Sequence, residues 1–266
     1  MKIISQFILL LVACCFVLHA QPARCEFVVY AGDLPPFHYA GEDSKQIEGV
    51  SIDILKDIMR ESDIVFHPEL VRMVPWARAI KETEMHPGYM LLGVAKTEDR
   101  LPLFKWIGPL CTVRMGLVAK KSRHIHINKK GDIFRYSIGV INNSAPASLL
   151  HGSVGIPMER LTLLTDNLQQ FRMLEAERVD LITHVDTVAP YFMRRLGYNP
   201  DDYEMVFVMK ELPLYIVVNK TTDDAVVHKL QHALDAMKKR PSGGASRYDA
   251  ILHTHLGGQA LEVTGP

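Results

Sequence analysis

The chain has 266 residues, 48% of them hydrophobic, and its 30 Lys and Arg residues balance 30 Asp and Glu residues. This composition is too apolar for a disordered chain, and the absence of a basic excess argues against nucleic acid as a partner. At roughly 150 residues per domain, the length allows one large domain or two small ones.

Residues 1–20 have the pattern of a secretion signal. Lys2 precedes a continuous apolar run, and Ala20 provides a small residue for cleavage. No other run approaches the roughly 18 apolar residues of a membrane span, so we expect a soluble, periplasmic protein. A second interpretation takes Leu11-Val12-Ala13-Cys14 as a lipoprotein box with an acylated Cys14. The residues after Cys14 stay apolar, which favours simple secretion.

Removal of the signal leaves Cys25 and Cys111 as the only cysteines. Two cysteines in an oxidising compartment can pair. A disulfide needs Cα atoms roughly 4.4–6.8 Å apart, and the sequence does not give that separation. A disulfide and two free thiols therefore both fit.

The rest of the chain alternates segments typical of strands and helices, which is the pattern of an α/β protein. Strands are expected where β-branched and apolar residues run without a break, and helices where apolar residues recur at helical spacing. In chain order we expect strand 27–31, helices 51–60 and 76–84, strands 89–95, 115–119 and 137–141, helices 147–150 and 168–176, strand 179–183, helix 189–196, strand 214–218 and helix 225–237. A helix, a turn, a buried strand and a polar loop occur at 76–100 and again at 168–190, which favours two similar α/β lobes.

Five short motifs fall in an order that resembles the type 2 periplasmic solute-binding proteins, specifically the amino-acid-binding family 3. They are Pro36-Phe37 followed by Gly49-Val50-Ser51-Ile52-Asp53, Trp76 at the start of a helix, Thr97-Glu98-Asp99-Arg100, Gly139-Val140 leading to Asn143-Ser144, and Val179-Asp180-Leu181 followed by Asp186-Thr187. The resemblance covers residues 26–257. It implies a two-lobed clamp in which each lobe is a mixed sheet flanked by helices.

The resemblance also implies where the lobes divide. The first lobe is expected to comprise 26–110 and 214–266, and the second 111–213. Two hinge crossings are then expected near 109–113 and 210–214.

Several positions depart from the family pattern, and they concern the ligand. The loop 33–37 is shorter than in typical amino-acid binders, and Ala95 stands where a Ser or Thr usually contacts the ligand. Ser51 stands where the family commonly has an Asp, and Tyr89 also replaces an Asp that is usual in the family. Asn143 replaces a Gly of the second lobe's loop. A ligand outside the standard amino acids is therefore compatible with the sequence.

Arg100, Asp186 and Trp76 are the leading candidates for ligand contacts. The resemblance assigns the ligand carboxylate to Arg100, whose planar guanidinium matches a carboxylate bidentately. Asp186 is expected to accept hydrogen bonds from a ligand ammonium, or alternatively to cap the following helix. Trp76 resembles the aromatic that covers the ligand, although a tryptophan at a helix start is equally compatible with the core.

Ser144, Asp33 and Tyr39 are further candidates for the ligand site. Ser144 lies in a loop before a short helix, where a hydroxyl and backbone N–H groups can hold a carboxylate, or where it can serve as an ordinary cap. Asp33 and Tyr39 lie in the first loop and are expected to contact a ligand side chain. Arg78 is interpreted as a solvated helix residue.

We expect neither a metal nor a cofactor. The 12 histidines include the pairs His124-Ile125-His126 and His253-Thr254-His255, but neither pair has a third ligand at a motif spacing. A solvated face explains both pairs. Phosphate-binding glycine loops and His-Glu-x-x-His patterns do not occur in the sequence.

The leading hypothesis is a monomeric, non-enzymatic binding protein for a small polar solute, an amino acid or a related carboxylate. By the resemblance, its partner is the membrane permease of an ABC transporter with its ATPase.

A second hypothesis is a dehydratase of cyclohexadienyl acids such as prephenate or arogenate, since the same fold hosts such enzymes. That enzyme needs a proton donor, for which His38, Glu98 and Asp33 are available. A third is a sensor subunit that docks on a membrane receptor.

Overall fold

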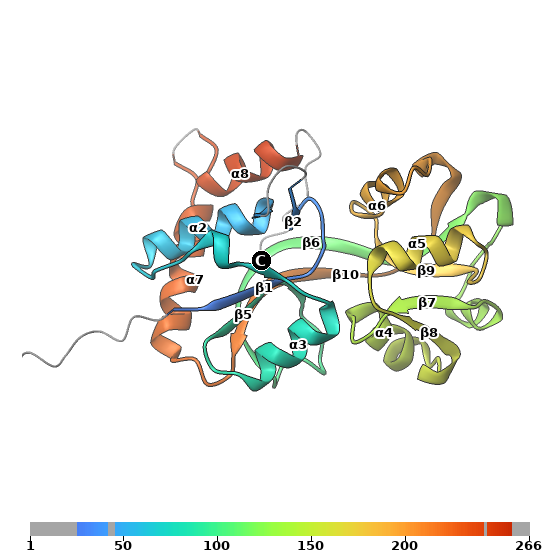
Figure 1. Ribbon diagram of the computed structural model, residues 1–266, viewed down its shortest axis with the longest axis horizontal. Coiled ribbons are helices and arrows are strands. Elements are labelled where there is room, and N and C mark those ends of the chain that lie inside the picture. The colour runs from blue at the N-terminus through green and yellow to red at the C-terminus, as the bar shows by residue number, and fades with distance from the viewer. Residues whose placement is uncertain (1–25, 42–45, 242–243, 257–266) are drawn as a thin grey trace, which may run out of the picture.

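Two α/β lobes joined by two long strands make up the protein (Figure 1). The computed structural model describes residues 26–41, 46–241 and 244–256. The joining strands β6 (Phe104–Lys120) and β10 (Tyr203–Asn219) have 17 residues each and pair antiparallel from end to end. At roughly 3.3 Å per residue each strand spans about 55 Å, so both strands run through both lobes.

One eight-stranded mixed sheet therefore passes through the whole molecule, in the order β4-β1-β5-β10-β6-β9-β7-β8. On the first lobe's side, β1 (Val28–Ala31) pairs parallel with β4 (Arg72–Met73) and β5 (Tyr89–Ala95). On the second lobe's side, β7 (Ile138–Ile141) pairs parallel with β8 (Leu161–Leu164) and β9 (Leu181–Val185). A separate hairpin joins β2 (Tyr39–Ala40) to β3 (Ile47–Glu48).

Helices cover both faces of the first lobe's strands. The helices α2 (Val50–Glu61), α7 (Asp224–Lys238) and α8 (Arg247–Leu256) pack together on one side, and α3 (Trp76–Met85) lies on the other (Figure 1). Alternate residues of the strands enter the two cores, with Val29 on the side of α2 and Tyr30 on the side of α3. Burial on both faces explains why β1 and β5 are almost continuously apolar.

The second lobe repeats this arrangement with shorter elements. The helices α5 (Asn167–Glu175) and α6 (Ala189–Arg195) contribute Phe171 and Phe192 to one core. On the opposite face, α4 (Ala145–Leu149) and its continuation cover Val140 of β7. Short helical segments of three to six residues make up the remaining described elements: Pro68–Leu70, Lys121–Arg123, Lys130–Arg135, Leu150–Val154, Met158–Arg160 and Pro200–Asp202.

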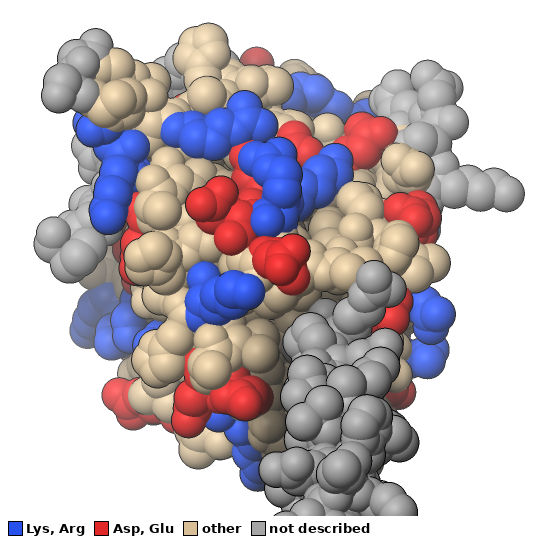
Figure 2. Space-filling view, turned by 90° about the vertical axis from the view of Figure 1, so that its left-hand side faces the viewer, with Lys and Arg blue, Asp and Glu red and all other residues tan. Residues whose placement is uncertain are grey.

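Ion pairs fix the last helix of the first lobe onto α2. Asp57 of α2 accepts a hydrogen bond of 2.6 Å from Arg247 of α8 and pairs with Arg60 at 2.8 Å. Nε2 of His255 lies 2.8 Å from Oδ2 of Asp53. Figure 2 shows the end of this lobe, where Lys and Arg side chains lie among Asp and Glu side chains rather than in a patch of one sign.

The expected α/β architecture with helices on both sides of a mixed sheet is confirmed. The sequence missed the strands β2, β3, β4 and β8 and the helix α8, and it predicted only the most apolar parts of β6 and β10. Both long strands extend further because each continues to pair with the other across polar positions, such as Glu211 opposite Arg114. The expected lobe boundaries at 110 and 214 fall within these two strands.

The secretion signal, Cys14 and Cys25 lie outside the described residues. Cys111 is a free thiol in the described part and is 2% exposed, and its burial raises the thiol pKa to about 12. In the ranges that the structure describes, no helix is long and apolar enough to cross a membrane.

Candidate functional site

A cavity of about 400 Å³ lies between the two lobes. The first lobe lines it with the segments that follow β1, β4 and β5, and the second lobe with those that follow β7 and β8 and with the end of β9. Met115 of β6 and Leu214 of β10 complete the lining. Carboxyl ends of parallel strands meet at one edge of a sheet, which is where open α/β proteins bind ligands. The volume suits a small molecule.

Arg100 places a buried positive charge at this cavity. Arg100 lies in the turn after β5, where its backbone N–H donates a hydrogen bond to the carbonyl of Thr97. The residue is only 3% exposed. Burial lowers its pKa to about 10, partly opposed by Asp99, so the guanidinium stays charged at neutral pH. Among the described residues no carboxylate lies within ion-pairing distance of it, and its Nη1 has no hydrogen-bond partner. Such a group favours an anion.

Trp76 lies beside Arg100 and faces the second lobe. It begins α3, and the guanidinium carbon of Arg100 lies 5.8 Å from its ring centroid. The indole Nε1 donates a hydrogen bond of 3.1 Å to the carbonyl of Asn143 in the second lobe, and Nη2 of Arg100 donates one of 2.6 Å to the same oxygen. One carbonyl therefore connects the two first-lobe residues to the opposite lobe.

Asp33 makes a second connection between the lobes. Its carboxylate accepts a hydrogen bond of 3.1 Å from Arg195 of α6, and its backbone carbonyl accepts one of 2.7 Å from Asn167 at the start of α5. Burial raises the pKa of Asp33, and Arg195 opposes this rise. A third contact joins Asp99 to Ser148 at 3.1 Å. These contacts join the two lobes on either side of the cavity.

Ser144 lines the second lobe's wall, where it caps the short helix α4. Its Oγ accepts a hydrogen bond of 3.4 Å from the backbone N–H of Ala147, and the residue is 8% exposed. The hydroxyl therefore serves the helix, as the alternative interpretation expected, and also belongs to the cavity lining.

The same wall contains His184, which sequence reasoning missed. Its Nδ1 lies 3.2 Å from the carbonyl of Val185; because a carbonyl only accepts, Nδ1 is the nitrogen that donates. Burial lowers the pKa of the ring to about 4, so it is neutral at pH 7. Nε2 is then an acceptor, and it has no partner among the described residues.

Gln170 provides a second acceptor, and it too was missed. Its Nε2 donates to the carbonyls of Gly139 and Thr183, each at 3.1 Å, which assigns Oε1 as the free acceptor. The residue is fully buried on the apolar side of α5. A polar residue on the buried face of an amphipathic helix was the signal available in the sequence, and His184 within a buried strand was a similar one.

Four of the six expected residues line the cavity: Arg100, Trp76, Ser144 and Asp33. Asp186 does not belong to the lining. Strand β9 runs two residues further than expected, to Val185, and Asp186 continues its pairing with β6, so that its carboxylate lies 3.5 Å from Nη1 of Arg114. Tyr39 is also outside the lining and lies against Tyr191, with 6.0 Å between ring centroids.

The histidine pairs do not form a metal cluster. His253 and His255 lie on helix α8, where residues two apart do not share a face. His124 has left-handed backbone geometry after the turn 121–123. Within the described ranges no three His, Cys, Asp or Glu side chains lie close enough together to hold a metal ion.

Residues 27–252 match the model of a family described as bacterial extracellular solute-binding proteins, family 3. No protein among the curated sequences matches the chain.

Solved structures share the fold at low sequence identity. The substrate-binding protein of an amino acid ABC transporter is 19% identical with a TM-score of 0.71, over 86% of this chain and 99% of that one. An ABC uptake transporter substrate-binding protein from Streptococcus pneumoniae with bound histidine is 17% identical with a TM-score of 0.73, over 90% and 94%. A histidine kinase sensor domain with similarity to periplasmic binding proteins is 16% identical with a TM-score of 0.73, over 88% and 97%. These likenesses establish the two-lobed fold of periplasmic binding proteins.

Proposed function

Since the chain belongs to the bacterial extracellular solute-binding proteins of family 3, we propose that it captures a small polar solute in the periplasm for an ABC transporter. The solute is an amino acid or a related carboxylate. The protein acts as a monomer, needs no covalent chemistry and delivers its ligand to a membrane permease.

The observation that carries this proposal is the buried cation of Arg100 in a cavity between two lobes. A guanidinium that has no carboxylate partner in an apolar site gains most from a carboxylate, which it can bind through two parallel hydrogen bonds. Trp76 would form one wall beside that carboxylate, and Ser144 and Asp33 contribute polar atoms from opposite sides.

Ligand-driven closure is the proposed mechanism. The lobes touch through Asn143 and through Asp33, while the long strands β6 and β10 form the connection between them. Bending near 109–113 and 210–214 would separate these contacts and open the cavity. A ligand drives closure because it contacts both lobes only in the closed state.

Thermal unfolding of the mature protein against amino acids, small carboxylates and polyamines tests the proposal. A ligand at about 100 times its Kd should add roughly 2.7 kcal/mol to the free energy of unfolding, which gives a clear rise in Tm. Stabilisation by an amino acid or a carboxylate is the expected result. Stabilisation by polyamines alone would contradict the role of Arg100.

A sensor subunit is the second candidate, and the likeness to a histidine kinase sensor domain favours it over an enzyme. Ligand capture would be the same, but the partner would be a membrane receptor. Isolation of the protein with its membrane partner, followed by identification of a permease or a kinase, distinguishes the two.

The dehydratase hypothesis finds little support in the site. Of its three candidate proton donors, His38 and Glu98 are outside the cavity lining, and Asp33 is paired with Arg195. Incubation of the purified protein with prephenate and arogenate tests it directly, and formation of product would revive it.

A further inference from the structure

We propose that the solute of this cavity is an organic monocarboxylate without an ammonium group, with an apolar body and a neutral hydrogen-bond donor such as a hydroxyl. The inference rests on the proposed function and specifies which of its solute classes the site selects. Three features carry it: the charges of the lining, two unpaired neutral acceptors and the apolar walls.

The charges of the lining favour one anion and no cation. Arg100 has no carboxylate partner, whereas each of the two lining carboxylates already has at least one partner. Asp33 is paired with Arg195 at 3.1 Å, and the exposed Asp166 caps α5 by accepting from the N–H of Gln169 at 2.7 Å. Oδ1 of Asp33 is buried without a partner, but the charge of this carboxylate is already balanced by Arg195. A ligand ammonium would therefore add a positive charge beside Arg195, in a cavity that already contains the charge of Arg100.

Asp186, the acid expected to receive an ammonium, cannot compensate from its observed position. Its carboxylate lies beside Arg114 and accepts from the backbone N–H of Thr187 at 2.7 Å, outside the cavity lining. The arginine of the expected amino-acid clamp is therefore present at the cavity, and its acidic counterpart is not.

Two neutral acceptors in the second lobe's wall have no donor among the described residues. Nε2 of His184 and Oε1 of Gln170 are buried without a partner, on residues that line the cavity. Leaving buried acceptors unpaired is unfavourable. A hydroxyl supplies a donor without bringing a positive charge, so a hydroxylated acid satisfies these atoms and Arg100 together.

The remaining walls indicate an apolar body. Side chains from both lobes and from the connecting strands line most of the cavity with carbon: Leu34, Met73, Trp76, Met115, Ile141 and Leu214. In a cavity of about 400 Å³, these walls suit an aliphatic or aromatic chain rather than a second charged group.

Calorimetric titration with matched ligand series tests the inference on the unmodified protein. Each series contains an α-amino acid, its 2-hydroxy acid and its deaminated acid, for example leucine, 2-hydroxy-4-methylpentanoate and 4-methylpentanoate, or phenylalanine, 3-phenyllactate and 3-phenylpropanoate. We expect a 2-hydroxy acid to bind at least about 10-fold more tightly than its amino acid, and also more tightly than its deaminated acid.

The outcomes separate this inference from the proposed function. If an amino acid binds as tightly as its hydroxy acid, or more tightly, the inference is overturned and the solute-binding function stands. If no member of the series binds, and the full set of amino acids and carboxylates is silent as well, both fail.

Three variants test the individual contacts. Replacing His184 by Phe or Gln170 by Met should reduce the preference for the hydroxy acid over the deaminated acid in at least one variant, and an unchanged preference in both would overturn the acceptor role. Asp186→Asn should change the affinity for the hydroxy acid by less than about 2-fold. A loss of more than 10-fold that is confined to amino acids would place Asp186 at an ammonium and overturn the inference.

Discussion

Replacement of Arg100 by alanine should abolish ligand binding and leave the fold intact. Removing one partner of a buried, hydrogen-bonded charge pair costs roughly 2–5 kcal/mol, which is a loss of about 30-fold to several thousand-fold in affinity. Without ligand, the guanidinium has no carboxylate partner, and its burial opposes its charge. The variant should therefore unfold at the same Tm as the parent or at a higher one. Calorimetric titration and thermal unfolding measure the two effects.

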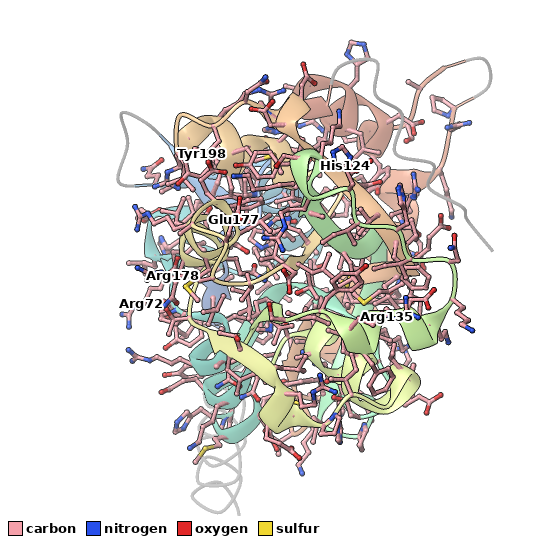
Figure 3. The ribbon with its side chains drawn as sticks, turned by 90° about the vertical axis from the view of Figure 1, so that its right-hand side faces the viewer. Arg72, His124, Arg135, Glu177, Arg178 and Tyr198 are labelled. Carbon is pink, nitrogen blue, oxygen red and sulfur yellow. The ribbon has the colours of Figure 1, made fainter. Side chains whose placement is uncertain are left out.

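Two control variants separate the charge from its geometry. Arg178→Ala removes an exposed arginine from the second lobe, which Figure 3 views from the end away from the first lobe, and it should bind ligand normally. Arg100→Lys keeps the charge but not the planar fork, so it should bind with intermediate affinity. If Arg100→Ala binds as the parent does, the carboxylate site lies elsewhere in the cavity.

The position of Arg100 was predictable because it depends on local features. A buried strand, Tyr89–Ala95, followed by the polar turn 97–100 places a side chain at the end of a strand whatever the rest of the fold does. The same holds for Trp76, which begins α3 directly after Pro75. Residues whose environment follows from one strand or one helix start could be expected in the cavity lining from the sequence.

Asp186, His184 and Gln170 depend on pairings between distant segments, which the sequence does not contain. A strand expected over 179–183 leaves Asp186 in a loop, but the pairing of Val185 with Met115 of β6 extends that strand and carries Asp186 to Arg114. Gln170 is polar within an amphipathic helix, and its function as a cavity acceptor follows only from the carbonyls of β7 and β9 that take its N–H groups. Contacts between distant segments therefore determine which residues of the second lobe line the cavity.

Two buried histidines should make the protein steeply sensitive to mild acid. His38 is fully buried, with Nδ1 3.3 Å from the hydroxyl of Ser51 and its ring against the backbone of Gly93, and burial lowers its pKa to about 3. The pKa of His184 is lowered to about 4 by burial. In the unfolded chain both rings have a pKa near 6.5. As the pH falls below about 6.5, the unfolded state therefore binds two protons that the folded state excludes.

The free energy of unfolding should accordingly be constant above about pH 7 and fall as the pH drops from 6.5 towards 4. Each excluded proton contributes about 1.4 kcal/mol per pH unit, so the two rings together contribute roughly 2.7 kcal/mol per pH unit. Denaturant unfolding at pH 7, 6, 5 and 4.5 measures this slope.

Replacing His184 by Phe, which matches its neighbours Phe171 and Phe192 in character, should halve the slope, whereas His126→Gln at an exposed position should not change it. A free energy that stays flat between pH 6.5 and 4.5 would mean that both rings accept protons in the fold. His184 would then be a hydrogen-bond donor at the cavity, and the case for a hydroxylated ligand would lose one of its two acceptors.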